Sequence, residues 1–432
     1  MREETNTMTG THVHPGCDEF KRTTGSRRNF LKGLGVVTAG GVMATMHGTV
    51  FKQTAFAASG QASNILVVLS QRGGADGMSL VVPYGDPNYK VARPTIGIPP
   101  GQLLQTDGFF GLHPRLAPLE QMWSKGQMAA VHATGLKVAN RSHFSAIVEL
   151  EEANTGSTQR IGWLNRMIGM NDPGSLFGAV QVGNGVPETE VYGSQATLSA
   201  QDVGLVQVYG PSNAMPQRVA SLNSTWNGAS GPLGKAGRDA MDTAVEWAPV
   251  LRVSTAPQNG ANYPGTDLGD ALAQSARVIR GNVGAEVITI DHSSWDMHTG
   301  LGTLDDGDMR LMADDLAKSI AAFFTDLGAL ADNVTMVTIS EFGRRVIENG
   351  DAGLDHGWGN AMLLLGAGVK GGTVYSKWPG LDLTAGAEAD LSVTTDYRSV
   401  LYEVVKTQFP NVSLPSMFPG LSYNRVGVMQ GA

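Results

Sequence analysis

The sequence predicts an α/β fold in which helices pack around a mostly parallel sheet. After residue 57, short apolar runs alternate with segments of helical periodicity, and this alternation is typical of parallel α/β proteins. Hydrophobic residues make up 42% of the 432-residue chain and charged residues 16%, so the chain can bury a large core, while its 56 glycines provide for many turns. A largely disordered chain is therefore excluded.

Five continuous apolar runs are the predicted strands of this sheet. Such runs are expected where both faces of a sheet are covered by helices. They occupy residues 64–70, 128–132, 285–290, 334–340 and 361–365.

Two helices are predicted from their sequence patterns. The clearer one covers about 309–330, because apolar residues recur there every three or four positions, as one buried helix face requires. These residues are Met309, Met312, Leu316, Ile320, Phe323 and Leu327. The second helix follows Thr395, whose hydroxyl we expect to cap the segment DYRSVLYEVVKTQF.

Between about 171 and 260 the pattern weakens into Gly-, Ser- and Asn-rich stretches such as LNSTWNGASGPLG. We interpret this region as an inserted cap that consists largely of loops. The expected organisation is one large domain over 58–432 that contains this insertion.

Residues 1–57 have the features of a twin-arginine export signal. The stretch SRRNFLKGLG, with Arg27 and Arg28, is followed by a weakly apolar segment at 36–46 and an A-x-A sequence at 55–57. The alternative is a membrane anchor, but glycines interrupt the apolar part, which is shorter than the roughly 20 residues that a span needs. We therefore expect the twin-arginine translocase as a partner, a periplasmic or secreted protein, and no stable membrane span. This route carries folded proteins, which favours a chain that acquires a cofactor before export.

Charge and cysteine content limit the partners and the metal chemistry. Residues 1–57 hold seven Lys/Arg and four Asp/Glu, which leaves 24 basic and 35 acidic residues and a net charge of −11. This acidic balance disfavours binding to nucleic acid. The single cysteine, Cys17, lies in the signal, so any metal site must use His, Asp, Glu and water. Those ligands suit a divalent ion such as Zn, Mn, Mg or Ca rather than an iron–sulfur cluster.

Polar residues follow or precede the predicted strands, at the sheet edge where ligands bind in open α/β folds. The stretch ITIDHSSWDMHTG is the richest of these segments in Asp and His. Several carboxylates that converge at strand ends need a cation or another partner, because unpaired buried charge is costly. The candidate metal ligands are Asp76, Asp296, His298, Glu341, Asp355 and His356. The alternatives are local turn and cap hydrogen bonds, or salt bridges to Arg344 and Arg345.

The stretch RSHFSAIVELEEANTG places Ser142 at the predicted start of another helix. Ser142 can be an N-cap, or it can be a nucleophile or anion ligand where free amides and the helix dipole favour negative charge. The neighbouring Arg141 can clamp an oxyanion or face solvent. The sequence leaves both pairs of alternatives open.

Taken together, several motifs resemble a bacterial twin-arginine-exported family, the domain of unknown function 1501, over nearly the whole chain. These motifs are RRNFLKGLG, RGGADGMSLVVPYGD, FGLHPRLAPL, RSHFSAI, GWLNR, DHSSWDMHTG, TISEFGRR and DHGWGNAMLLLGAGVKGG. The resemblance implies an alkaline phosphatase-like α/β sandwich, as in the alkaline phosphatase and sulfatase superfamily, with a two-metal site at the carboxyl ends of the strands.

The order of residues in that superfamily implies Ser142 as the nucleophile and Asp76, Asp296 with His298, Glu341 and His356 around the metals. The chain departs from the pattern in the sequence SEF, which has Glu341 in place of an aspartate and Phe342 in place of a metal-binding histidine. Asp296 and His298 are also closer in sequence than the usual pair. One metal position is therefore expected to be weak, altered or empty.

Two functions follow from the resemblance. The first is an exported metal-dependent hydrolase of phosphate or sulfate esters, acting on an anionic ester of unknown identity. The second is a non-catalytic periplasmic or surface binding protein that retains the fold. No Cys/Ser-x-Pro-x-Arg signature is found, which disfavours a classical sulfatase.

Overall fold

The computed structural model describes residues 62–171 and 177–431. The predicted twin-arginine segment, residues 1–57, lies outside the described residues. Along the part of the chain that is described, no helix combines the length and the apolar character that crossing a membrane requires.

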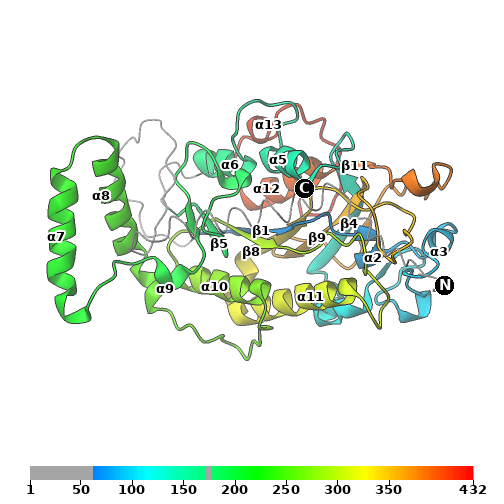
Figure 1. The fold of residues 1–432 in the computed structure, drawn as a ribbon, viewed down its shortest axis with the longest axis horizontal. Coiled ribbons are helices and arrows are strands. Elements are labelled where there is room, and N and C mark those ends of the chain that lie inside the picture. Colours follow the sequence, from blue (N-terminus) through cyan, green and yellow to red (C-terminus); the bar gives the residue numbers. More distant parts are fainter. Residues whose placement is uncertain (1–61, 172–176, 432) are drawn as a thin grey trace, which may run out of the picture. The chain divides into compact units, whose positions relative to one another are not determined.

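The central sheet is mostly parallel, as predicted (Figure 1). Only β9 runs antiparallel to its neighbours, β4 and β8. The order of the strands is β10 (Val374–Tyr375), β4 (Met128–Gly135), β9 (Asn360–Gly366), β8 (Val334–Ile339), β1 (Ile65–Gln71), β7 (Val287–His292), β5 (Ala179–Val182) and β6 (Leu198–Ala200), and β11 (Thr395–Asp396) pairs with β4. A separate antiparallel pair joins β2 (Val81–Val82) to β3 (Gly111–Leu112).

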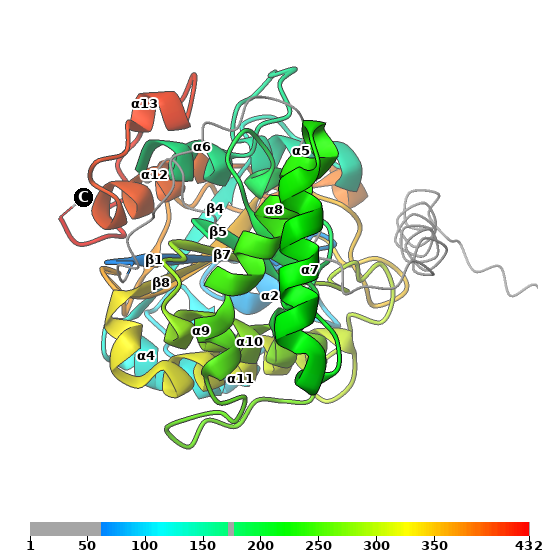
Figure 2. The same cartoon turned by 90° about the vertical axis from the view of Figure 1, so that its left-hand side faces the viewer.

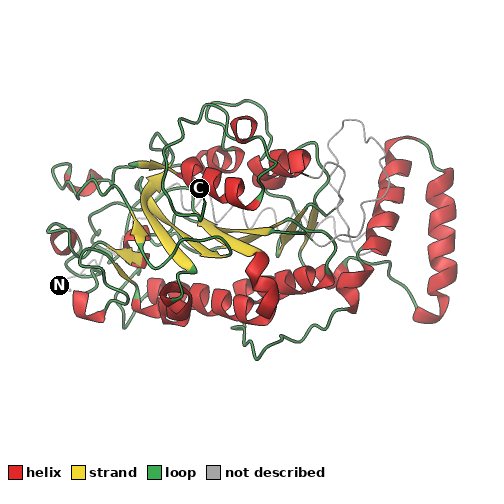
Figure 3. Ribbon diagram, turned by 180° about the vertical axis from the view of Figure 1, so that it is seen from behind, coloured by secondary structure: helices red, strands yellow, loops and turns green. Residues whose placement is uncertain are grey.

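All five predicted strands are present, with ends that shift by up to three residues. Most of their residues are buried, because helices cover both faces of the sheet. Figure 3 shows the strands as a yellow layer between red helices. The short strands β5 and β6 were not predicted, because three or four residues carry too little pattern to be distinguished from a loop.

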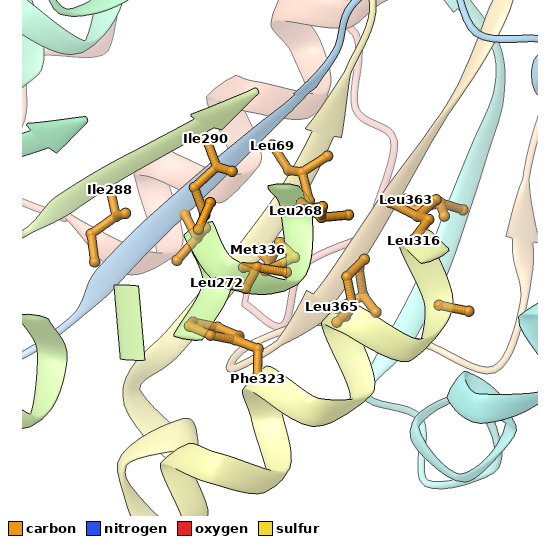
Figure 4. Packing of buried hydrophobic residues seen from close by; sticks show 14 of the residues in the cluster. Leu69, Leu268, Leu272, Ile288, Ile290, Leu316, Phe323, Met336, Leu363 and Leu365 are labelled. Carbon is orange, nitrogen blue, oxygen red and sulfur yellow. The ribbon is translucent and has the colours of Figure 1, made fainter. Parts of the chain in front are cut away.

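Alternate residues of each strand face two different sets of helices. Val67 and Leu69 of β1 pack on the side of α10 (Asp267–Gly281) and α11 (Asp308–Leu327). Figure 4 shows leucines of both helices against this face of the sheet. Leu66 and Val68 pack on the opposite side, which is covered by α5 (His143–Glu152), α6 (Trp163–Asn171) and α12 (Tyr397–Gln408).

The two predicted helices are present with altered ends. Helix α11 begins at Asp308 and ends at Leu327, three residues early, because Gly328 takes a positive φ of 54°. Helix α12 begins at Tyr397, and its cap is Asp396 rather than Thr395: the Asp396 carboxylate accepts a hydrogen bond from the amide of Arg398. The prediction of Thr395 as the cap is therefore wrong by one position. The shorter helices are α2 (Gly77–Leu80), α3 (Tyr89–Ala92), α4 (Glu120–Ser124) and α13 (Leu414–Met417).

The region 171–260 is not the loop-rich cap that the sequence suggested. It contains β5 and β6 of the main sheet, followed by α7 (Met215–Gly228), α8 (Gly231–Glu246) and α9 (Ala248–Arg252). Helices α7 and α8 lie side by side (Figure 2). The stretch LNSTWNGASGPLG spans the end of α7 and the start of α8. Helix α7 buries no residue completely, so its apolar pattern is sparse and its helical character is hard to detect from sequence.

Candidate metal centre

Four loops and helix ends bring histidine and carboxylate side chains together beyond the carboxyl ends of β1, β7 and β8. The loop after β7 carries Asp296 and His298, and Glu341 follows β8. His356 precedes β9, and His143 is the first residue of α5. The parallel strands end at one edge of the sheet, which explains why residues distant in sequence meet there.

His143, Asp296 and His356 form the centre of this group. The two Nε2 atoms of the histidines lie 3.0 Å apart. Asp296 Oδ1 lies 3.3 Å from Nε2 of His356 and 3.7 Å from Nε2 of His143. Each residue thus offers one ligand atom, and these atoms all lie within 4.8 Å of one another. Two imidazole nitrogens and a carboxylate are a ligand set that fits a divalent transition metal.

His298 also approaches the Asp296 carboxylate. Its Nε2 lies 3.3 Å from Asp296 Oδ1, and its ring centroid lies 4.6 Å from that of His356. We therefore name His143, Asp296, His298 and His356 together the histidine centre.

The outer nitrogen of each histidine is held by a hydrogen-bond acceptor. His143 Nδ1 lies 2.8 Å from Glu341 Oε1, and His298 Nδ1 lies 2.7 Å from Asp355 Oδ1. His356 Nδ1 lies 2.9 Å from the backbone oxygen of Arg141. An acceptor at Nδ1 favours a proton there and leaves the lone pair on Nε2. A metal ion beside Asp296 would then meet a lone pair from each Nε2 atom, which is the arrangement that metal-binding histidines usually have, whereas without a metal Nε2 can carry a proton that is hydrogen-bonded to Asp296.

Glu341 and Asp355 were predicted as metal ligands, but the structure gives both a different position. Each accepts the Nδ1–H of a histidine and so orients a metal-binding side chain from outside. Glu341 is buried and is itself fixed, because its Oε1 accepts a hydrogen bond from the Gly73 amide at 2.8 Å. Gly73 has a φ of 111°, and a Cβ there would lie 2.6 Å from the Asp296 amide, so glycine is required at this position.

Asp76 lies outside the group, contrary to the prediction. Its two oxygens lie 2.5 and 3.0 Å from the guanidinium of the buried Arg93. Burial raises the pKa of Asp76, but the charge and hydrogen bonds of Arg93 overcome this effect and hold the pKa below its ordinary value. A carboxylate with both oxygens bound to arginine is satisfied without a metal.

Arg344 supplies a fixed positive charge beside the histidine centre. Its Nη2 lies 2.8 Å from Asp296 Oδ1, and its other nitrogens donate to the backbone oxygens of Gly74 and Leu354. The salt bridge considered as an alternative for Asp296 is therefore present. The carboxylates of Asp296, Glu341 and Asp355 carry three negative charges, of which Arg344 balances one. A divalent ion would balance the other two, so the local charge fits one metal ion.

The pKa shifts reflect this geometry in the metal-free protein. Burial acts to raise the pKa of Asp296, but hydrogen bonds from His143, His298 and His356 hold it well below its ordinary range. Burial acts to lower the pKa of His143, but hydrogen bonds to Asp296 and Glu341 raise it to about 9. The pKa of His356 is lowered, mainly by burial. Without a metal, an extra proton is therefore favoured on His143 and disfavoured on His356.

Ser142 occupies the N-cap position of α5, as predicted, but its side chain makes no capping hydrogen bond. The residue is exposed, and its amide donates to Asn140 Oδ1 at 3.2 Å. The guanidinium of Arg141 forms a salt bridge with Asp390 at the surface, so its positive charge is already paired. Arg141 contributes to the centre through its backbone oxygen, on His356.

The sequence interpretation missed His143. The residue follows Ser142 directly in the motif RSHFSAI, and as the first residue of α5 it turns inward while Ser142 stays exposed. Its position next to a predicted site serine was the available signal. Phe342, which stands where the superfamily pattern has a metal-binding histidine, packs against His143 and His356. Its ring centroid lies 4.8 Å from the centroids of both imidazoles.

Comparisons with known proteins give one family. A model described as "Protein of unknown function (DUF1501)" matches residues 63–411, which confirms the predicted resemblance. A search of the curated proteins gave no match.

Several solved structures are similar at low identity. A PsFucS1 sulfatase from Pseudoalteromonas sp. has 10% identity and a TM-score of 0.35, with 85% of this chain and 73% of that chain covered. The C-terminal periplasmic domain of EcEptC from Escherichia coli, in complex with Zn, has 12% identity, a TM-score of 0.28 and coverages of 72% and 74%. A phosphonate monoester hydrolase of Agrobacterium radiobacter has 8% identity, a TM-score of 0.28 and coverages of 84% and 79%.

Proposed function

The chain belongs to the DUF1501 family, and from its histidine centre we propose that it is an exported metal-dependent hydrolase of phosphate or sulfate esters. The observation that carries the proposal is the orientation of three histidines: their Nδ1 atoms are held by Glu341, Asp355 and the Arg141 oxygen, and their Nε2 atoms face Asp296. Histidines with a purely structural role would not need Nε2 atoms that all face one carboxylate.

The proposed metal is one divalent ion at His143, Asp296 and His356, with His298 as the further ligand. Zn or Mn suits this set better than Mg or Ca, because imidazole nitrogens outnumber the carboxylate oxygen. When bound, the ion would supply Lewis acidity that polarises the ester and lowers the pKa of an attacking hydroxyl or water.

The chain's own residues would bind and orient the anionic ester. Helix α5 begins next to the centre, and its first amides and dipole favour an anion there. Ser142 is the proposed nucleophile, because its hydroxyl is not engaged in capping and both neighbours in sequence contact the site. Arg344 would keep Asp296 ionised and in place.

The second proposed function is a non-catalytic binding protein that keeps one metal. The observation in its favour is that Arg93 occupies both oxygens of Asp76, while Phe342 packs where the superfamily pattern has another histidine. These features leave the described residues with a single metal-binding group.

Metal analysis and an ester panel test the proposal. We expect about one Zn or Mn per chain after dialysis, and loss of that ion in Asp296→Asn. The matched control is Asp314→Asn, which breaks only a surface pair with Lys318 and should keep the metal.

Substitution of the serine separates the two functions. Ser142→Ala should abolish hydrolysis of aryl phosphate or sulfate esters, with a change in the free energy of unfolding below about 1 kcal/mol, because the hydroxyl makes no capping bond. If the metal is bound but the wild-type protein hydrolyses no ester in a broad panel, the binding-protein function replaces the hydrolase.

A further inference from the structure

A cleft with a volume of about 200 Å³ lies along helix α5. Its walls are α5 and the segment 154–160, which follows the helix after a turn at Ala153, where φ is 46°. The volume suffices for one six-membered ring, since a cavity of about 150 Å³ holds benzene. We name it the α5 cleft, and the side chains that define it are Phe144, Ser145, Val148, Glu149, Glu152 and Arg160.

The near end of the α5 cleft lies about one helical turn from the proposed nucleophile. Ser145 lines the cleft and follows Ser142 by three residues, so their backbones are about 5 Å apart along the helix. The Asn140 side chain joins the two positions, because its Oδ1 accepts hydrogen bonds from the Ser142 amide at 3.2 Å and from the Ser145 hydroxyl at 2.9 Å. The alcohol portion of an ester held at Ser142 can therefore extend into the cleft.

The charges of the α5 cleft disfavour a second anion. Glu149 and Glu152 contribute two carboxylates, and Arg160 contributes one guanidinium, whose Nη1 lies 3.1 Å from Glu152 Oε1. The lining is thus negative by one charge, whereas the start of α5 favours an anion. These opposite preferences orient a substrate with its phosphate or sulfate at the helix start and an uncharged portion in the cleft.

The lining combines an apolar surface with hydrogen-bonding groups, as a sugar ring requires. Phe144 is 39% exposed and Val148 is half-buried, so both offer apolar surface to the C–H face of the ring. Carboxylates accept hydrogen bonds and a guanidinium donates them, which matches hydroxyls that do both. An alkyl chain in the same place would displace water from these polar groups without replacing its hydrogen bonds.

We propose that the α5 cleft binds the sugar portion of the ester, so that the substrates are sugar phosphates or sugar sulfates. The assignment rests on the proposed ester hydrolysis for the position of the charged group, but binding of the sugar does not require turnover. Phe144 and Val148 would contact the ring, and Glu149 would accept its hydroxyls.

The test uses the full chain loaded with Zn²⁺ and compares esters that differ in the alcohol. We expect kcat/KM for glucose-6-phosphate to exceed that for butyl phosphate by about tenfold or more, and the two corresponding sulfates to differ in the same direction. Val148→Trp fills the cleft and should abolish this preference. Phe144→Ala gives the same comparison at an exposed position if the tryptophan variant does not fold. The matched control is Val245→Trp, at a 65% exposed valine of α8, which should keep the wild-type preference.

Calorimetric titration of the Zn²⁺-loaded Ser142→Ala variant with the same esters measures binding without turnover. Tighter binding of glucose-6-phosphate than of butyl phosphate, lost when Val148→Trp is added, would support the cleft even if the wild type hydrolyses neither ester, an outcome that would contradict only the hydrolase. Equal binding of the two phosphates would overturn the assignment of the cleft, and the hydrolase would stand if both are still hydrolysed. A preference for the sugar ester that persists in the folded cleft variants would overturn the assignment as well.

Discussion

At the scale of single residues, the histidine centre depends on which nitrogen of each imidazole carries a proton. Glu341 and Asp355 fix this choice for two histidines, and a backbone oxygen fixes it for His356. Because these acceptors contact the outer nitrogens of the histidines and would not be metal ligands themselves, their effect on a metal would be indirect. Replacement of such outer partners typically costs 10- to 100-fold in metal affinity.

His143 should make the stability of the metal-free protein depend on pH. Its pKa of about 9 lies above the ordinary 6.5, so its contribution is fully present below pH 6.5 and is lost as the pH rises through about 9. The size is about 3 kcal/mol at most, from the difference between the two pKa values. Urea unfolding of the metal-free chain between pH 6 and 10 measures it.

Glu341→Gln tests whether Glu341 sets the pKa of His143, since the substitution removes the negative charge but keeps an acceptor near Nδ1 of His143. We expect a smaller loss of stability between pH 6.5 and 9 than in the wild type, and weaker metal binding by roughly tenfold. A pH profile identical to that of the wild type would show that Glu341 does not set the pKa of His143.

At the scale of elements, the ends of helices place the functional groups. Helix α5 carries a charged contact at each end, because His143 at its first residue enters the histidine centre and Glu151 near its last turn pairs with Arg72. Ten residues of α-helix span about 15 Å. A change in the position of α5 would therefore affect both contacts.

Helix α12 allows a test of how a cap is chosen between adjacent residues. Asp396 accepts the Arg398 amide at 3.0 Å and also binds the Arg398 guanidinium, so Asp396→Ala should lower the free energy of unfolding by about 1–2 kcal/mol. Thr395→Ala is the control and should change it by less than about 0.5 kcal/mol. Guanidinium titration of both variants provides the values, and equal losses would contradict the assignment of Asp396 as the cap.

At the scale of the whole molecule, export remains a prediction that rests on Arg27 and Arg28. Replacement of both by lysine should leave the precursor in the cytoplasm, because the pair is the feature by which the translocase would distinguish this signal. Fractionation and immunoblotting of cells measure the distribution. Unchanged export of the double variant would contradict the twin-arginine route, while retention of the wild type would contradict export altogether.

The sequence by itself determined the fold class, five strands of the sheet, the main helix α11 and the family. Continuous apolar runs and a helical period are local patterns, and they persist in the structure because both faces of the sheet are covered. It also located Asp296, His298 and His356, since polar residues next to buried strands stand out from their surroundings. It failed for α7 and α8, whose few buried residues leave little pattern.

Only the tertiary structure decided which of these polar residues meet, and what each one contacts. Asp76 and Glu341 both follow buried strands, yet Asp76 forms a salt bridge with Arg93 while Glu341 accepts a hydrogen bond from His143. His143 enters the centre because the first turn of α5 directs it inward, which depends on how the helix packs on the sheet. The partner of a carboxylate is fixed by side chains distant in sequence, so no local pattern could have separated a metal ligand from a salt bridge or a histidine acceptor.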